Sequence, residues 1–278
     1  MILIAGFVYF RFFNEKERFP IAEGDIAVHF IDVGQGDSIF IESGGETMLI
    51  DCGESSETDK VISYLEELNV ERLDYVIATH PHSDHMGGMY KIIDEFDIGK
   101  VMIPHLDPND TPTTQYFEKF LDSCNNKNIT LSYARKGNVI HLGSSEAEII
   151  APCSDDYNNV NNYSVGIFLM HGKTSFILTG DAEKLAEDEM IESGSLRHAD
   201  VYKAGHHGSD TSGSQDFMDI ILPDYAVISC GAGNSYGHPC ESTLERLSQF
   251  TDKIYRTDLC GTIVFVSDGE NITVRTER

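Results

Sequence analysis

At residues 79–88 the chain reads THPHSDHMGG, so three histidines and one aspartate fall within six positions. The apolar run at residues 75–78 comes directly before them and is typical of a buried strand. A loop that leaves a strand end can turn several side chains toward one point, whereas an extended strand sends successive side chains to opposite faces. Neutral imidazole and carboxylate are ligands that suit zinc, manganese and iron. The stretch therefore predicts a metal site, which we prefer to a polar surface loop because so dense a cluster rarely arises by chance.

The composition limits the classes of function. The chain has 278 residues, 41% of them hydrophobic, which is enough to bury the core of one large domain or two halves. Its formal charge of -26 repels a polyanion over most of the surface, and no basic groove is evident. Any contact with nucleic acid must therefore be local or metal-mediated. Six cysteines without a CxxC pair are too few for a disulfide scaffold in a chain of this length.

Residues 1–24 stand out as a hydrophobic N-terminal segment. Residues 1–13 are nearly all apolar but too few for a membrane span, which needs about 20 residues. We interpret the segment as the remnant of a signal anchor, which predicts an extracytoplasmic protein that is membrane-anchored or secreted. The alternative is a strand or tail packed on the body of a cytoplasmic protein. Residues 25–278 are expected to form the main domain.

The order of the expected elements predicts the fold class. Strands and helices alternate in two comparable halves, which is typical of an α/β protein with two sheets between outer helices, a four-layer αββα sandwich. Polar residues follow several strand ends, and we expect these ends to converge on one edge of the sheet pair. The expected helices cover residues 58–69, 89–96, 113–124, 183–192 and 242–250. The expected strands include residues 26–32, 38–41, 47–51, 75–78, 100–104, 163–170, 174–179, 199–204, 225–229, 253–256, 261–266 and 271–274.

The histidine loop holds enough ligands to begin a two-metal site. A hydrolytic pair of cations lies about 3.5–4 Å apart and shares a bridging water or hydroxide. We expect His80 and His82 to bind one cation, and Asp84 and His85 to bind the other. Asp181, which follows an apolar strand and a glycine, is the expected bridging carboxylate. Its alternative role is the N-cap of the helix that comes next.

Further nitrogen ligands must come from later in the chain. His206, His207 and His238 follow strand ends and are the available histidines. One of His206 and His207 is expected not to bind metal, and His238 has the alternative role of a turn residue. Asp51, at the end of a strand, either caps a turn or hydrogen-bonds the histidine loop from behind.

Several motifs beyond the histidine loop carry a family resemblance. The chain resembles the metallo-β-lactamase-fold hydrolases, whose signature is THxHxDH between a strand-end aspartate and a later Gly-Asp. Within that superfamily it is similar to the ComEC-type competence branch, which is associated with DNA internalization. The resemblance covers about residues 25–266. Its motifs are DVGQGDS at 32–38, LIDCG at 49–53, NNYS at 161–164, GD at 180–181, HHGS at 206–209 and YGHP at 236–239.

The resemblance implies an αββα sandwich with the site at the open edge between the sheets. Many superfamily members carry a separate histidine before the bridging aspartate, where this chain has Asn161, Asn162 and Ser164. We expect the HHGS pair to fill that vacancy, and the departure argues against a β-lactamase. Asp37, in the DVGQGDS motif, and Asp51 are expected to stand behind the ligands. The implied ligands are His80, His82, Asp84, His85, Asp181, one of His206 and His207, and His238.

These residues predict a metal-dependent hydrolase that holds two divalent ions, zinc or manganese. The expected reaction is cleavage of a phosphodiester by a metal-activated hydroxide, as in a DNA nuclease. Asp84 would bind metal and orient the hydroxide. Whichever of His206 and His207 is not a ligand would contact a phosphate oxygen or protonate the leaving group. Substrate contacts, each with turn chemistry as the alternative, are expected from Asn162, Ser164, Ser209 and Tyr236.

Other functions stay open at this point. A related branch of cell-wall phosphorylcholine esterases shares the same general motifs. The same metal chemistry hydrolyses carboxylic esters, thioesters and lactams, and the non-enzymatic alternative is a metal-stabilised binding module with a degenerate site. The expected partner is a phosphoester substrate, with DNA as one candidate, and the N-terminal segment is the candidate membrane contact.

Overall fold

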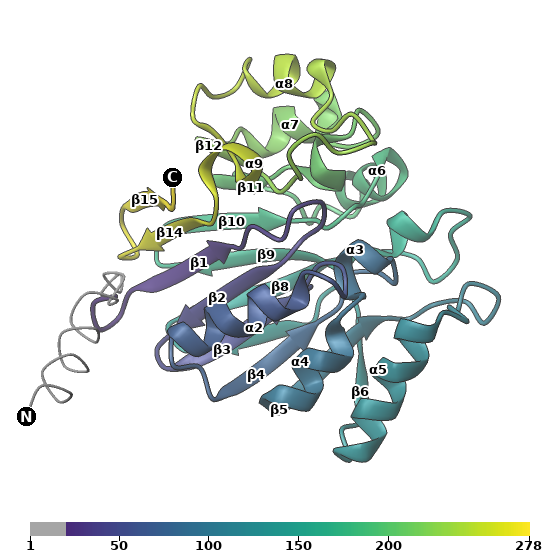
Figure 1. Cartoon of the computed structure of the whole chain (residues 1–278). Coiled ribbons are helices and arrows are strands. Elements are labelled where there is room, and N and C mark those ends of the chain that lie inside the picture. The colour runs from purple at the N-terminus through teal and green to yellow at the C-terminus, as the bar shows by residue number, and fades with distance from the viewer. Residues whose placement is uncertain (1–20) are drawn as a thin grey trace, which may run out of the picture.

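The computed structural model describes residues 21–278, which form two mixed β-sheets packed face to face (Figure 1). The first sheet has the strand order β15-β14-β1-β2-β3-β4-β5-β6 and the second has the order β13-β12-β11-β10-β9-β8-β7. The first sheet is made of β1 (Ile26–Phe30), β2 (Ile39–Ser43), β3 (Glu46–Ile50), β4 (Arg72–Ile77), β5 (Asp97–Pro104), β6 (Leu131–Ala134), β14 (Ile263–Ser267) and β15 (Ile272–Thr276). The second is made of β7 (Val139–Leu142), β8 (Ser145–Ala151), β9 (Gly166–His171), β10 (Thr174–Leu178), β11 (Val201–Lys203), β12 (Tyr225–Ile228) and β13 (Ile254–Arg256).

The core between the sheets follows the alternation of side chains along each strand. Ile26, Val28 and Phe30 of β1 point into this core, where they join Ile167 and Leu169 of β9. All five side chains are fully buried. Burial of apolar surface on this scale is the main force that holds the two sheets together.

Helices cover the outer face of each sheet (Figure 1). Val61 and Leu65 of α2 pack on the first sheet, and Phe217 and Ile221 of α7 pack on the second. These four layers confirm the predicted αββα sandwich. The helices are α2 (Thr58–Glu67), α3 (Ser83–Met86), α4 (Met89–Glu95), α5 (Gln115–Asn126), α6 (Lys184–Glu192), α7 (Gln215–Ile221), α8 (Glu241–Leu247) and α9 (Thr257–Cys260), with short 3-10 turns η1 (Val160–Tyr163) and η2 (Gly205–Gly208).

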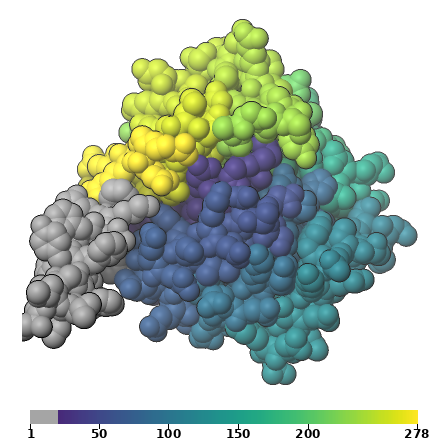
Figure 2. Space-filling model, in the orientation of Figure 1, coloured from purple at the N-terminus to yellow at the C-terminus, as the bar shows by residue number. Residues whose placement is uncertain are grey.

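The C-terminal end of the chain returns to the first sheet. Strand β14 pairs antiparallel with β1, and β15 pairs with β14 at the sheet edge. Figure 2 shows the yellow C-terminal residues against the purple segment, with the blue and green parts of the chain on either side. The two halves that the sequence suggests are therefore joined in one sandwich.

Parallel strand runs bring the polar strand ends to one edge. In the first sheet β3, β4, β5 and β6 are parallel, and in the second sheet β10, β11, β12 and β13 are parallel. The carboxyl ends of parallel strands lie on the same side of a sheet, where α/β proteins usually bind their ligands. Asp51 and His80 follow β3 and β4, while Asp181 and His207 follow β10 and β11.

Some expected elements differ from the structure. The expected strand at 163–170 begins only at Gly166, because η1 occupies Val160–Tyr163. The sequence reasoning missed α7, although Phe217, Met218 and Ile221 have helical spacing and are buried together under the second sheet. It also missed α3 and α9, which are single turns too short to show a periodicity.

The expectation for the first 20 residues lies outside the described part of the chain. Within residues 21–278, no helix is both long enough and apolar enough to cross a membrane. The first strand of the described part, β1, begins at Ile26, and the domain boundary at residue 25 stays a prediction.

Candidate metal centre

One carboxylate oxygen lies among four histidine nitrogens at the edge of the sheet pair. Oδ2 of Asp181 lies 3.2 Å from Nε2 of His85 and 3.5 Å from Nε2 of His207. The same oxygen lies 3.7 Å from Nε2 of His206 and 3.9 Å from Nε2 of His80. The other oxygen of Asp181 is buried and has no hydrogen-bond partner among the described residues. Such a convergence is what a bridging carboxylate of a metal pair requires.

Ring nitrogens also face each other across the centre. Nε2 of His85 lies 3.3 Å from Nε2 of His207, and Nε2 of His80 lies 3.0 Å from Nδ1 of His82. Nε2 of His207 is also 3.3 Å from Oδ2 of Asp84. A neutral imidazole has a single N–H, so when Nδ1 of His85 donates to Asp51 and Nδ1 of His207 donates to the backbone oxygen of Ser229, each Nε2 presents a lone pair to the centre. This donor set fits divalent metal ions, with nitrogen and carboxylate ligands of the kind that zinc and manganese accept.

The structure brings the predicted ligands together in two tiers. The side chains of His80, His85 and His207 are fully or almost fully buried, whereas His206 and His238 stand at the rim, with ring centroids 5.4 Å apart. Nδ1 of His238 is buried and has no partner among the described residues, so it is open to a ligand. The choice of ligands, and the bridging role of Asp181, stay predictions.

The backbone decides which member of the HHGS pair reaches the inner tier. His206 and His207 both have left-handed conformations, with φ values of 50° and 55°. Non-glycine residues rarely adopt this region, and strained backbone of this kind often occurs at functional sites. The tight turn sends His207 inward and leaves His206 partly exposed, with its Nδ1 atom 3.1 Å from Oγ1 of Thr211. His207 is therefore the one that takes the inner place.

The inner carboxylates and histidines shift one another's protonation. Burial would raise the pKa of Asp181, but His207 and His85 hold it well below its usual value. Burial would lower the pKa of His85, but Asp181 and Asp51 raise it well above the ordinary value. Burial and the neighbouring His85 both lower the pKa of His80, which lies well below its ordinary value. Asp181 is therefore charged and His80 neutral, which are the forms that bind metal.

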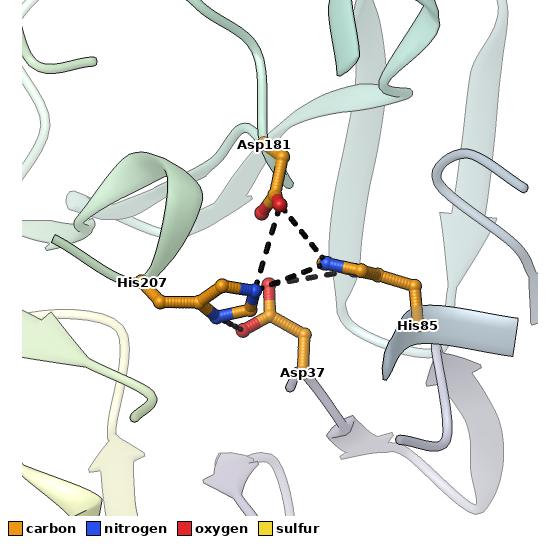
Figure 3. A group of neighbouring side chains, drawn as sticks. All are labelled: Asp37, His85, Asp181 and His207. Atoms are coloured by element: carbon orange, nitrogen blue, oxygen red, sulfur yellow. Dashed lines mark hydrogen bonds and ion pairs between the residues drawn. The ribbon is translucent and has the colours of Figure 1, made fainter. Parts of the chain in front are cut away.

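Two expected supporting carboxylates occupy different places. Asp51 is fully buried and accepts a hydrogen bond from the backbone N–H of Thr79, so it stands behind the histidine loop as expected. Asp37 lies closer to the centre, because one of its oxygens lies within 4.8 Å of ligand atoms of His85, Asp181 and His207 (Figure 3). Position alone would make Asp37 a candidate ligand.

The substrate contacts expected from the NNYS and HHGS motifs differ from the structure. Ser164 is fully buried, where its hydroxyl accepts the N–H of Asp181 and lies 3.3 Å from Nδ1 of His80. Asn162 is buried and accepts the N–H of Glu183, the N-cap residue of the helix after Asp181. Ser209 is buried beside Thr211. These three residues do not line the cavity. Their hydrogen bonds therefore support the site from inside the protein, and their side chains are not open to a substrate.

A cavity of about 320 Å³ opens onto the centre, and Tyr236 stands at its mouth. Tyr236 is 68% exposed and stacks on His238, with ring centroids 5.8 Å apart and planes at 25°. Gln35 and Tyr116 also line the cavity, and the sequence offered no signal for either beyond the GQGDS motif around Gln35. The lining is formed by Gln35, His82, Ser83, Asp84, Tyr116, Asp181, His206, His207, Tyr236 and His238.

Comparison with protein families now identifies the chain. A model of the metallo-β-lactamase superfamily matches residues 31–232. The chain belongs to the metallo-β-lactamase superfamily. The match includes every predicted ligand of this superfamily domain except His238.

Relatives of known name place this metallo-β-lactamase domain near competence proteins. It is 31% identical to ComE operon protein 3 of Bacillus subtilis in an alignment of 268 positions, which covers 89% of this chain and 34% of that protein. It is 27% identical to competence protein ComA of Neisseria gonorrhoeae in an alignment of 270 positions, which covers 95% of this chain and 35% of that protein. The chain spans about a third of the length of these relatives. The similarity to the ComEC-type competence branch is thereby confirmed.

A solved structure agrees with the superfamily fold. The metallo-β-lactamase fold protein YhfI from Bacillus subtilis aligns with a TM-score of 0.52 at 12% identity. The alignment covers 83% of this chain and 95% of that one. At this identity the likeness concerns the fold alone.

Proposed function

We propose that this metallo-β-lactamase domain is a metal-dependent phosphodiesterase that cleaves nucleic-acid phosphodiesters. The observation that carries the proposal is the group of four imidazole nitrogens around Oδ2 of Asp181, at the floor of a cavity open to solvent. The names of the competence relatives support a nucleic-acid substrate over other phosphoesters. When bound, divalent ions polarise a phosphoryl oxygen and lower the pKa of a water molecule.

Asp84 and His206 are the side chains that we assign to the reaction itself. Asp84 lines the cavity, and neighbouring His207 and His85 hold its pKa well below normal although burial would raise it. It is therefore an ionised acceptor that can orient a water molecule. His206 lines the same cavity at its rim, and Thr211 holds its Nδ1 side. Its Nε2 can donate a hydrogen bond to a phosphate oxygen or a proton to the leaving group.

The charge of the lining limits how much of a nucleic acid can bind. No lysine or arginine occurs among the described residues that line the cavity. Neutralisation of phosphate therefore falls to the metal ions and the histidines, and flanking phosphates meet an acidic surface. We infer that contact is restricted to the nucleotides beside the scissile bond, where the exposed ring of Tyr236 offers a stacking surface.

A second candidate is supported by the same lining. Tyr116 and Tyr236 face a cavity that also contains Asp84 and Asp181, and aromatic rings with nearby carboxylates attract a quaternary ammonium group. A phosphorylcholine ester is therefore the alternative phosphodiester. Carboxylic esters and lactams as classes carry no such cation, so this lining does not favour them.

A cleavage panel tests the proposal. Full-length protein is stripped of metal, reloaded with zinc or with manganese, and assayed on bis(p-nitrophenyl) phosphate, single-stranded DNA, duplex DNA, p-nitrophenyl phosphorylcholine and nitrocefin. We expect cleavage of DNA and of the aryl phosphodiester, and loss of both in Asp84→Ala. Asp122→Ala, an exposed carboxylate on α5, is the matched control. Equal turnover by wild type and Asp84→Ala rejects the mechanism, and activity on the choline ester alone favours the second candidate.

We also propose an extracytoplasmic location, with membrane anchoring through the hydrophobic segment at residues 1–24. The support is the composition of residues 1–13. Protease treatment of intact cells that produce the full chain tests this. Degradation of the domain from outside agrees with the proposal, and protection until lysis contradicts it.

A further inference from the structure

Lys203 is a fully buried lysine beside the metal centre. It ends β11, just before the HHGS turn, and its side chain has no exposed surface. Lysine is rarely buried without a charge partner, because transfer of an ammonium group out of water is costly. Its partner is Asp37, whose Oδ2 atom forms an ion pair with Lys203 Nζ. Lys203 therefore cannot contact substrate, and the proposed reaction gives it no part.

The two oxygens of Asp37 have different surroundings, because Oδ2 forms an ion pair with Lys203 and Oδ1 has no hydrogen-bond partner among the described residues. While Oδ2 pairs with Lys203, Oδ1 lies 3.4 Å from Nδ1 of His207, the ring nitrogen that does not face Asp181. The backbone oxygen of Ser229 already accepts from this nitrogen at 3.1 Å, so Asp37 adds mainly its negative charge. Figure 3 shows Asp37 beneath the gap between His85 and His207, and one of its oxygens lies within 4.8 Å of a possible ligand atom of each of them and of Asp181.

Lys203 also reaches the part of the chain that carries Asp181. Its ammonium donates a hydrogen bond to the backbone oxygen of Gly180 at 3.2 Å, and the same oxygen accepts the N–H of His206 at 3.1 Å. Gly180 has a φ of 54° and directly precedes Asp181. One buried ammonium thus joins the DVGQGDS loop of the first sheet to the Gly-Asp turn of the second.

We propose that Lys203 is a positioning residue of the metal centre, which keeps Asp37 out of the ligand set and holds it as the charged partner of His207. A free carboxylate at the position of Asp37 would turn toward a nearby cation, as Asp84 and Asp181 are predicted to do from the other side. The ammonium of Lys203 holds Oδ2 of that carboxylate instead and neutralises its charge. A carboxylate behind a metal-binding histidine fixes the ring and increases the basicity of its ligand nitrogen.

The charge state of Asp37 agrees with this arrangement. Burial would raise the pKa of Asp37, but Lys203 and His207 lower it to about 2.

A double variant gives the decisive measurement. Asp37→Asn with Lys203→Met removes both charges and keeps both shapes, a change that buried ion pairs often tolerate. We expect full-length protein with both changes to be folded by circular dichroism but to bind zinc about tenfold more weakly or worse, measured by competition with a chromogenic chelator. Wild-type zinc affinity in the folded double variant would overturn the proposal, because loss of an ion pair with a purely structural role would leave the zinc affinity unchanged.

The single variant tests exclusion of Asp37 from the ligand set. In Lys203→Met the Asp37 carboxylate loses its partner, so we expect it to bind the metal ion. An added ligand weakens the visible absorption of bound cobalt, so the absorption of the cobalt-loaded variant should fall. That change should disappear when Asp37→Asn is added. An unchanged cobalt spectrum, or a change that persists in the double variant, contradicts the proposal. If Lys203→Met does not fold, the zinc affinity of the double variant decides alone.

An exposed ion pair supplies the matched control. Nζ of Lys173 lies 2.7 Å from Oε2 of Glu270, and both side chains are largely exposed. Lys173→Met with Glu270→Gln removes the same two kinds of charge far from the centre. Its zinc affinity and cobalt spectrum should equal those of the wild type.

Discussion

Nδ1 of His85 lies 2.8 Å from Oδ2 of Asp51, and neither side chain is exposed. Asp51 also accepts hydrogen bonds from the backbone N–H and the hydroxyl of Thr79, at 2.8 Å and 2.6 Å. With Nδ1 engaged, the imidazole directs Nε2 toward Asp181 on the other sheet. The end of β3 thus aims a predicted ligand of the histidine loop across the sandwich, which is the arrangement that supports metal-binding histidines in proteins generally.

Asp51→Asn should weaken metal binding. The amide keeps the shape but loses the charge that fixes the tautomer of His85, and such changes typically reduce metal affinity by about 10- to 100-fold. Zinc affinity measured by chelator competition checks this, with Asp122→Asn on the exposed face of α5 as control. Unchanged affinity in Asp51→Asn would show that the hydrogen bond does not prepare the ligand.

Substitution of each of the two histidines in the HHGS turn should have a different effect. His207→Ala removes a nitrogen of the inner tier, so we expect loss of bound metal by elemental analysis. His206→Ala should keep its metal but lose turnover by about 10²–10⁴-fold on DNA, whose alkoxide leaving group needs a proton.

Bis(p-nitrophenyl) phosphate sharpens that test, because its leaving group departs without help from an acid. His206→Ala should lose much less activity on this substrate than on DNA. Equal losses on both substrates would contradict a role for His206 as the acid, and loss of metal in His206→Ala would make it a ligand instead.

Tyr236→Ala should raise KM for nucleic acids that carry bases. Stacking of a base on an aromatic ring contributes about 1–3 kcal/mol, so KM should rise by about 5- to 100-fold while Tyr236→Phe stays near wild type. A single-stranded oligonucleotide with abasic positions around the cleavage site is the control substrate, since it keeps the phosphates and offers no ring. An equal effect of Tyr236→Ala on both oligonucleotides would reject stacking.

The metal-free protein should lose stability as the pH rises. Burial would lower the pKa of His207, but Asp181, Asp37 and Asp84 raise it to about 9. A histidine whose pKa is higher in the folded state stabilises that state below its unfolded pKa of about 6.5, and this contribution is lost as the pH passes through about 9. The free energy of unfolding in a chelating buffer should therefore fall by up to about 3 kcal/mol over this window.

Urea unfolding followed by circular dichroism at several pH values measures this change. Zinc should remove the decline, because the ion takes the place of the proton and binds the neutral imidazole. His141→Ala, at an exposed histidine of β7, should leave the profile as it is. A flat profile for the metal-free wild type would contradict the predicted coupling between His207 and the carboxylates.

Much of this protein follows from local sequence. Alternating apolar residues predict the strands, helical spacing predicts α2, α4, α5 and α6, and polar residues after β3, β4, β10 and β11 predict an edge where they meet. The histidine loop at 79–88 indicates metal and the superfamily, because short spacing alone brings its ligands together. Helix α7 could also be predicted from the sequence, since Phe217, Met218 and Ile221 have helical spacing.

Only the tertiary structure decided how the edge is arranged. His206 and His207 are neighbours with equal chemistry, and a left-handed turn sends one inward and leaves the other at the rim. Ser164 reads as a polar loop residue, but packing of the two sheets buries it between Asp181 and His80. Lys203 reads as a basic residue beside the site, yet the partner that neutralises it lies 166 positions earlier in the chain, on the opposite sheet. Spacing along the chain reveals which chemical groups are present, whereas burial and long-range pairing determine which of them face a metal ion, a substrate or one another.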